Sequence, residues 1–222
     1  MNGEIPGGTG TGGSPGAPGP AGGAPRPAGG APRGRPRSAE ADRAILTATA
    51  DLLAERGLAA MSIEEVAARA GVGKTTIYRR WPSKGLLALD AFVISFRAEQ
   101  PQPDTGSLRG DLLSALHAWV RAVTQTAMGP MLTGLIAEAQ HDPELRGAWR
   151  DRVLEPMRTQ HRVMLDRAIE RGEIPATVDR DVVLDLFFGA AEHRLLLGHL
   201  PMTGDFIAEV VDMILAGIAG PR

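Results

Sequence analysis

The chain has 222 residues, 43% hydrophobic and 23% charged, the balance of a soluble globular protein of one or two domains. No run approaches the roughly 18 consecutive apolar residues of a membrane-spanning helix, and the absence of cysteine excludes disulfides and thiolate metal sites. The net charge of −2 conceals a gradient from +3 in residues 1–37 to −5 in residues 96–222. We therefore expect any polyanion to meet the amino-terminal part. The first residues form no secretory signal, which predicts a cytoplasmic protein.

Residues 1–37 hold 13 of the 28 glycines and 8 of the 17 prolines, and almost no large apolar side chain. Such a segment cannot bury enough surface to offset the entropy of ordering, so we predict a disordered tail. At its end, Arg33, Arg35 and Arg37 alternate with glycine and proline in the manner of AT-hook arms. Arginines in such an arm can enter a narrow DNA minor groove. A solubilising linker is the alternative.

From Ser38 onward the apolar residues recur with helical spacing. A first helix is predicted over about 39–56, with Gly57 as its stop. Ser62 and Glu65 form a capping box that opens a second helix. Gly71-Val72-Gly73 breaks the chain before a short third helix over 74–81, and Pro82 precedes a longer one that reaches about residue 99.

The remainder is also helical, in blocks over about 108–127, 130–140, 142–171, 179–199 and 205–219. Pro156 should kink or split the third of these blocks. Because no strand pattern or internal repeat occurs, we predict an all-α fold. Its parts are the tail (1–37), a helix-turn-helix DNA-binding domain (38–84) and a helical regulatory and dimerisation domain (85–222).

Residues 68–75 fit the relaxed spacing of a phosphate-binding loop, with alanine in place of the first glycine. That motif requires a strand that leads through a glycine-rich loop into a helix. Here the preceding residues belong to an amphipathic helix, so we reject nucleotide hydrolysis. We predict a protein that is not an enzyme and has no catalytic residues.

Two helices joined by a tight glycine-containing turn are instead typical of a helix-turn-helix. The third helix is then the one presented to the DNA major groove. Hydroxyl and cationic side chains suit base edges and phosphates, and this helix carries Lys74, Thr75, Thr76, Tyr78 and Arg79. Tyr78 has core packing as its alternative, Trp81 is expected to pack, and Arg80 is either solvated or bound to DNA.

Residues 43–89 resemble the DNA-binding domain of TetR-type repressors, through the capping Ser62, the Ala-Gly-Val turn, the aromatic pair Tyr78 and Trp81, and Lys84. The resemblance implies a three-helix head and a larger helical core that dimerises through its last two helices. It also implies that Ser62, Tyr78 and Lys84 hold phosphates, while Thr75, Thr76 and Arg79 face bases. The carboxy-terminal part resembles one subgroup of the family, although Glu192 and His193 replace an expected pair of tyrosines.

Apolar and methionine side chains of the larger domain suit an adaptable effector pocket, with ordinary helix packing as the alternative. The pocket candidates are Trp119, Met128, Met131, Met157, His161, Met164 and Phe188. The dimer candidates are Phe187, Ala191, Leu195, Phe206, Val210, Val211 and Ile214. The five histidines lack the spacing of metal ligands, so we expect neither a metal nor a cofactor.

The leading hypothesis is a homodimeric repressor that binds a pseudo-palindromic double-stranded DNA operator. A small-molecule effector of unknown identity would bind the core and shift the protein to a state that releases the DNA. A transcriptional activator is the first alternative. The second is a helical small-molecule-binding protein without DNA function.

Overall fold

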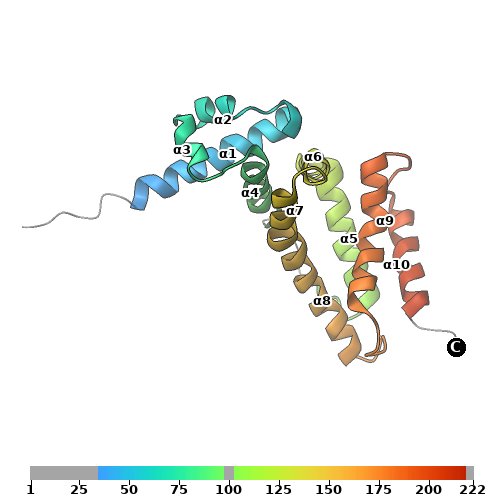
Figure 1. Cartoon of the computed structure of the whole chain (residues 1–222). Helices are drawn as coiled ribbons and strands as arrows, with labels where there is room; N and C mark the ends of the chain where they lie inside the picture. Colours follow the sequence, from blue (N-terminus) through green and yellow to red (C-terminus); the bar gives the residue numbers. More distant parts are fainter. Residues whose placement is uncertain (1–34, 98–102, 219–222) are drawn as a thin grey trace, which may run out of the picture. The chain divides into compact units, whose positions relative to one another are not determined.

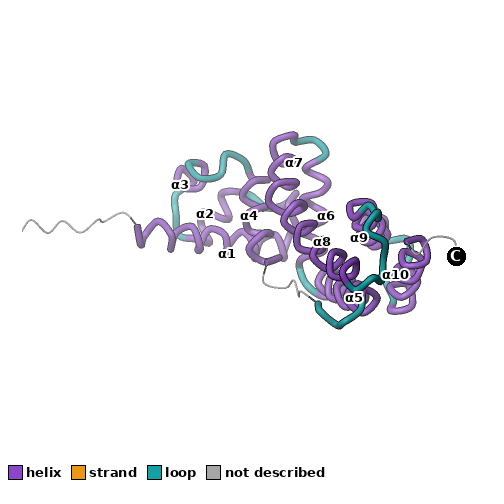
Figure 2. The backbone as a smooth tube through the Cα atoms, turned by 90° about the horizontal axis from the view of Figure 1, so that it is seen from below, coloured by secondary structure: helices purple, strands orange, loops and turns teal. Residues whose placement is uncertain are grey.

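The computed structural model describes residues 35–97 and 103–218 of the chain, and within these ranges it is helical throughout, with no strand (Figures 1 and 2). The all-α prediction is confirmed. The elements are α1 (Arg35–Ala60), α2 (Ile63–Ala70), α3 (Lys74–Tyr78), α4 (Lys84–Arg97), α5 (Leu108–Gln125), α6 (Met128–Ala139), α7 (Pro143–Trp149), the π-helical segment η1 (Arg150–Leu154), α8 (Glu155–Glu170), α9 (Arg180–Leu197) and α10 (Gly204–Ile218). None of the helices in these ranges is long and apolar enough to cross a membrane.

Helix α1 starts at Arg35, four residues before the predicted start. Pro36 is compatible with this, because a proline in the first turn removes only an N–H that has no intrahelical partner. Arg35 and Arg37 thus lie in a helical turn, whereas Arg33 and the rest of the predicted tail lie outside the described residues. The predicted stop is present as a break: Gly57 has a φ of 73°, and a second short helical stretch follows it to Ala60.

The first helices enclose an apolar centre formed by side chains such as Leu53, Val66 and Ile77, each fully buried. Ion pairs join the outer sides of α1 and α2. Arg69 donates to both carboxylate oxygens of Glu55, at 2.6 and 2.9 Å. The hydrogen bond from Arg69 lowers the pKa of Glu55. Helix α4 packs along α1. We use the term head for α1 to α4 together.

In the larger domain α5 packs against α10, α8 and α9, and α8 and α10 each contact α9 (Figure 2). Helix α6 contacts α1 and α4 as well as α5, so it joins the head to the rest of the fold. The predicted split at Pro156 takes the form of η1, a π-helical turn directly before α8. Such turns accommodate an extra residue in a helix.

Candidate nucleic-acid interface

Both ends of α2 are capped, at Ser62 and at Gly71. The Ser62 hydroxyl accepts a bond of 3.2 Å from the Glu65 N–H, which completes the predicted capping box with the Glu65 side chain on the Ser62 N–H. Gly71 ends α2 in the left-handed conformation with a φ of 67°, where a side chain would be strained. The chain can therefore reverse within three residues and present α3.

Helix α3 buries one side and exposes the other. Ile77 is fully buried, whereas Tyr78 is 50% exposed and Thr75 and Arg79 are exposed. The exposure of Tyr78 removes the core-packing alternative. The Arg79 guanidinium makes no ion pair or hydrogen bond with the described part of the chain, so it is available to an outside acceptor. Thr76 is half-buried beside them.

Lys74, at the start of α3, is paired within the head. Its Nζ lies 2.7 Å from Glu64 Oε1, and both side chains are more than half exposed. The hydrogen bond between them raises the pKa of Lys74 and lowers that of Glu64. An exposed pair of this kind is weak, so a DNA phosphate can replace the carboxylate.

Two other cations are bound more closely to the fold. Arg80 pairs with Asp42 of α1 and donates to the Thr76 carbonyl at 3.1 Å, so its side chain is held by the fold rather than solvated. Lys84 Nζ donates to the carbonyls of Leu58, Ala59 and Met61 at 2.9, 3.4 and 3.3 Å. An ammonium has three N–H donors, so a phosphate would have to displace one of these carbonyls.

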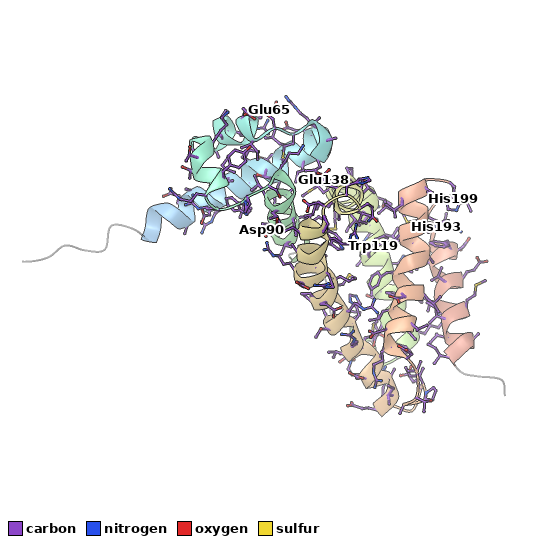
Figure 3. All side chains as sticks on the ribbon, in the orientation of Figure 1. Glu65, Asp90, Trp119, Glu138, His193 and His199 are labelled. Atoms are coloured by element: carbon purple, nitrogen blue, oxygen red, sulfur yellow. The ribbon has the colours of Figure 1, made fainter. Side chains whose placement is uncertain are left out.

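Trp81, which follows α3 after Arg79 and Arg80, is 7% exposed and packs as expected. Its indole N–H donates to Asp90 Oδ2 of α4 at 2.8 Å, and Arg152 of η1 donates to Asp90 Oδ1 at 2.8 Å. Figure 3 labels Asp90 on α4. Sequence reasoning missed Asp90 and Arg152, because Arg152 is 62 residues from its partner and no local motif marks the pair.

The predicted effector residues are all buried, but the structure divides them. Trp119, His161 and Phe188 form an aromatic cluster, with ring centroids 6.4 Å apart for Trp119–Phe188 and 5.0 Å for His161–Phe188 (Trp119 is labelled in Figure 3). His161 Nδ1 donates to the Met157 carbonyl at 2.8 Å, and burial lowers the pKa of His161. Met164 is also buried on α8.

The other two candidates, Met128 and Met131, border a separate hollow of about 250 Å³ where α1, α4 and the start of α6 meet. Ala50 and Asp51 of α1 and Phe92 of α4 also line it. An occupant of this hollow would contact both the head and the larger domain. Within the described residues, no group of three or more histidine or carboxylate side chains is arranged to hold a metal ion.

Five of the predicted dimer residues pack in the chain's own core. Phe187, Ala191, Phe206, Val211 and Ile214 are each at most 9% exposed, while Leu195 and Val210 are half-buried. Helical spacing marks α9 and α10 as apolar on two sides and does not say which side faces inward. The large apolar side chains that α9 and α10 expose are Val182, Leu186, Leu196, Leu197 and Met213.

Comparison with known proteins agrees with this architecture. Residues 45–91 match the family described as bacterial regulatory proteins, tetR family, and residues 102–214 match the tetracyclin repressor-like C-terminal domain. An HTH-type transcriptional regulator of Bacillus subtilis strain 168, YdeS, is 34% identical over 84% of this chain and 92% of its own. The DNA-binding transcriptional repressor TetR of Mycobacteroides abscessus is 36% identical over 80% and 93%. The crystal structure of the TetR family transcription regulator SCO0332 is 38% identical, with a TM-score of 0.71 over 81% of this chain and 98% of that one.

The fold and the exposed side of α3 thus define a helix-turn-helix DNA-binding protein with a helical second domain. The chain belongs to the TetR family of transcriptional regulators, which are not enzymes.

Proposed function

We propose that this regulator is a homodimeric repressor that binds a pseudo-palindromic operator and leaves it when a small molecule binds the larger domain. The observation that carries the proposal is the exposed side of α3, where the Arg79 guanidinium lacks a partner within the described residues and Tyr78 is half exposed. Free cationic and hydroxyl groups on a short, well-anchored helix suit the major groove. Of the two directions of regulation, the name of the M. abscessus relative favours repression.

The second copy is proposed to dock on the apolar outer side of α9 and α10. Leu186 and Met213 are 57% and 73% exposed there, and with Ala190, Val210 and Ile214 they line a hollow of about 220 Å³. Contiguous exposed apolar side chains mark protein contact surfaces. A two-fold contact of this kind would carry two α3 helices and so favour a palindromic site.

For the effector we propose an apolar small molecule that enters near α6. Support comes from α6 itself, which packs on α1 and α4 and contributes Met128 and Met131 to the hollow at that junction. A molecule that binds there more tightly in one arrangement of the helices shifts the population toward that arrangement. The aromatic cluster around Phe188 is a second place where an effector could insert.

The DNA part of the proposal is tested by selecting bound sequences from random duplexes with the full chain and measuring affinity for the recovered sequence. We expect a pseudo-palindrome. Arg79→Ala should weaken binding at least about fivefold, because a good base contact contributes about 1–3 kcal/mol. Arg121→Ala is the matched control, since Arg121 is an exposed arginine of α5. Equal affinity of the two variants would refute the role of Arg79.

Repression and release need a separate test, with a reporter gene placed behind the recovered sequence. A repressor lowers expression when the chain is present, and an activator raises it. A library of apolar small molecules then tests release, read as loss of DNA binding by the purified protein. If no compound in the library releases the DNA while direct binding to the chain is observed, the effector part of the proposal fails.

A further inference from the structure

The recognition helix α3 has only five residues, and its orientation depends on what holds its carboxy-terminal end. Ile77 anchors it from inside, and Trp81 comes one turn later in the chain. The backbone N–H groups of Arg80 and Trp81 both donate to the Ile77 carbonyl, each at 2.9 Å. The position of the Trp81 ring is therefore coupled to the orientation of α3.

Asp90 holds that ring from α4. Its Oδ2 accepts the indole N–H at 2.8 Å, and its Oδ1 accepts a charged N–H of Arg152 at 2.8 Å. Both oxygens of one carboxylate are thus used, one toward the DNA-binding head and one toward η1. The three side chains form a continuous chain of hydrogen bonds, which we name the Trp81–Asp90–Arg152 relay.

Helix α4 is packed against α7, which leads directly into η1 and Arg152. The Phe92 ring lies on the Trp149 ring with 5.4 Å between centroids, and Gly85 allows Leu145 of α7 to approach closely. Packing thus connects α7 to α4, and hydrogen bonds connect η1 to Trp81 through Asp90.

We propose that Arg152 and Asp90 are positioning residues for DNA binding: through Trp81 they hold α3 in the orientation that fits the major groove. The π-helical turn gives this contact a dependence on helix register. Conversion of the π-turn to regular α-helix would rotate the two flanking helical stretches relative to each other by about 100° about the helix axis. This rotation is enough to carry Arg152 away from Asp90. The larger domain can then change DNA affinity without altering any residue that touches DNA.

The test uses the full chain and the duplex recovered from random sequences. Loss of the hydrogen bond between Arg152 and Asp90 widens the range of α3 orientations. It therefore lowers the fraction of molecules in which α3 fits DNA. Arg152→Met and Asp90→Asn should therefore each weaken binding at least fivefold. Because the Arg152–Asp90 pair is partly exposed, melting temperatures should fall by less than about 3 °C. Arg152→Lys, which keeps a cation within reach of Asp90, should restore most of the affinity.

Two further variants separate positioning from structural effects. Arg150→Met removes a neighbouring exposed arginine that pairs with Asp151 and should leave affinity unchanged. Trp81→Phe combined with Arg152→Met should bind no more weakly than the weaker single variant, because both act through Asp90. The proposal is overturned if Arg152→Met binds DNA within twofold of Arg150→Met, or if the double variant shows the full sum of the two losses.

Discussion

Gly85 of α4 and Leu145 of α7 meet so closely that a β-carbon at residue 85 would lie 2.9 Å from Leu145 Cδ2. Leu145 is fully buried, so its side chain has little room to withdraw. We expect Gly85→Ala to destabilise the fold by about 1–3 kcal/mol, the range for overpacking a filled core. Urea unfolding measures this.

Gly147→Ala is the control for that substitution. Residue 147 is also a helical glycine, and a β-carbon there would have nothing within 4 Å. The added methyl group should stabilise α7 by about 0.5–1 kcal/mol, since alanine restricts the unfolded chain more than glycine does. Equal effects of the two substitutions would contradict the close contact between α4 and α7.

Lys84 donates to three main-chain carbonyls at the end of α1. We expect Lys84→Met to lower stability by about 1–2 kcal/mol, because charged hydrogen bonds and a cation at a helix terminus are both lost. Lys74→Met, which breaks only an exposed pair, should leave the melting temperature unchanged. If Lys84→Met lost DNA affinity but kept full stability, Lys84 would act by binding a phosphate, as the family resemblance implies, rather than by stabilising the end of α1.

The arginines of the amino-terminal tail should contribute to DNA binding through charge. Deletion of residues 1–34 removes Arg26 and Arg33 and is expected to weaken operator binding. It should also reduce the slope of log affinity against log salt concentration by about 1–2, at roughly 0.9 for each phosphate contact. Deletion of residues 1–24, which keeps both arginines, is the matched control. A slope that is the same in both truncations and in the full chain would refute the predicted contribution of these arginines to DNA binding.

The outer side of α9 and α10 should determine oligomeric state. Leu186→Glu places a charge in the proposed contact with the second copy and should convert the dimer to a monomer in sedimentation velocity. Val163→Glu, at a 47% exposed apolar position of α8, should remain dimeric. A dimeric Leu186→Glu variant, or a monomeric wild type, would contradict the proposed face.

His161 should make stability depend on pH. Burial lowers its pKa from the ordinary value of 6.5, against a smaller opposing effect of its bond to Met157. The unfolded chain therefore takes up the proton first, so stability is complete above 6.5 and falls as the pH drops below it. Unfolding in urea at about pH 7.5 and about pH 5.5 should show a smaller loss in His161→Gln than in wild type.

Glu192 changes the pH dependence of stability in the opposite direction. Because Glu192 is present in both wild type and His161→Gln, its effect cancels when the two are compared. Burial, with a contribution from Asp185, raises the pKa of Glu192, so protonation favours the folded state as the pH falls. His141→Gln, at an exposed histidine, controls for histidine loss in general. An acid-induced loss of the same size in wild type and His161→Gln would show that His161 is not the group responsible.

Much of the head was predictable because its signals are local. The Ser62–Glu65 capping box, the left-handed Gly71 and the break at Gly57 each act within a few residues, and all three occur where expected. Helical periodicity gave the all-α fold in the same way. The polar side of α3 was also predictable from spacing, since Ile77 alone marks its inner side.

The remaining features depend on pairs that are far apart in the chain. Periodicity identified α9 and α10 as apolar but could not say that Phe187 faces the chain's own core while Leu186 faces outward. The carbonyl partners of Lys84 lie 23 or more residues away in the sequence. Asp90 likewise bonds both Trp81 and Arg152. Local sequence specifies helices and their ends through short-range bonds, whereas partners of side chains are chosen only when the helices pack together.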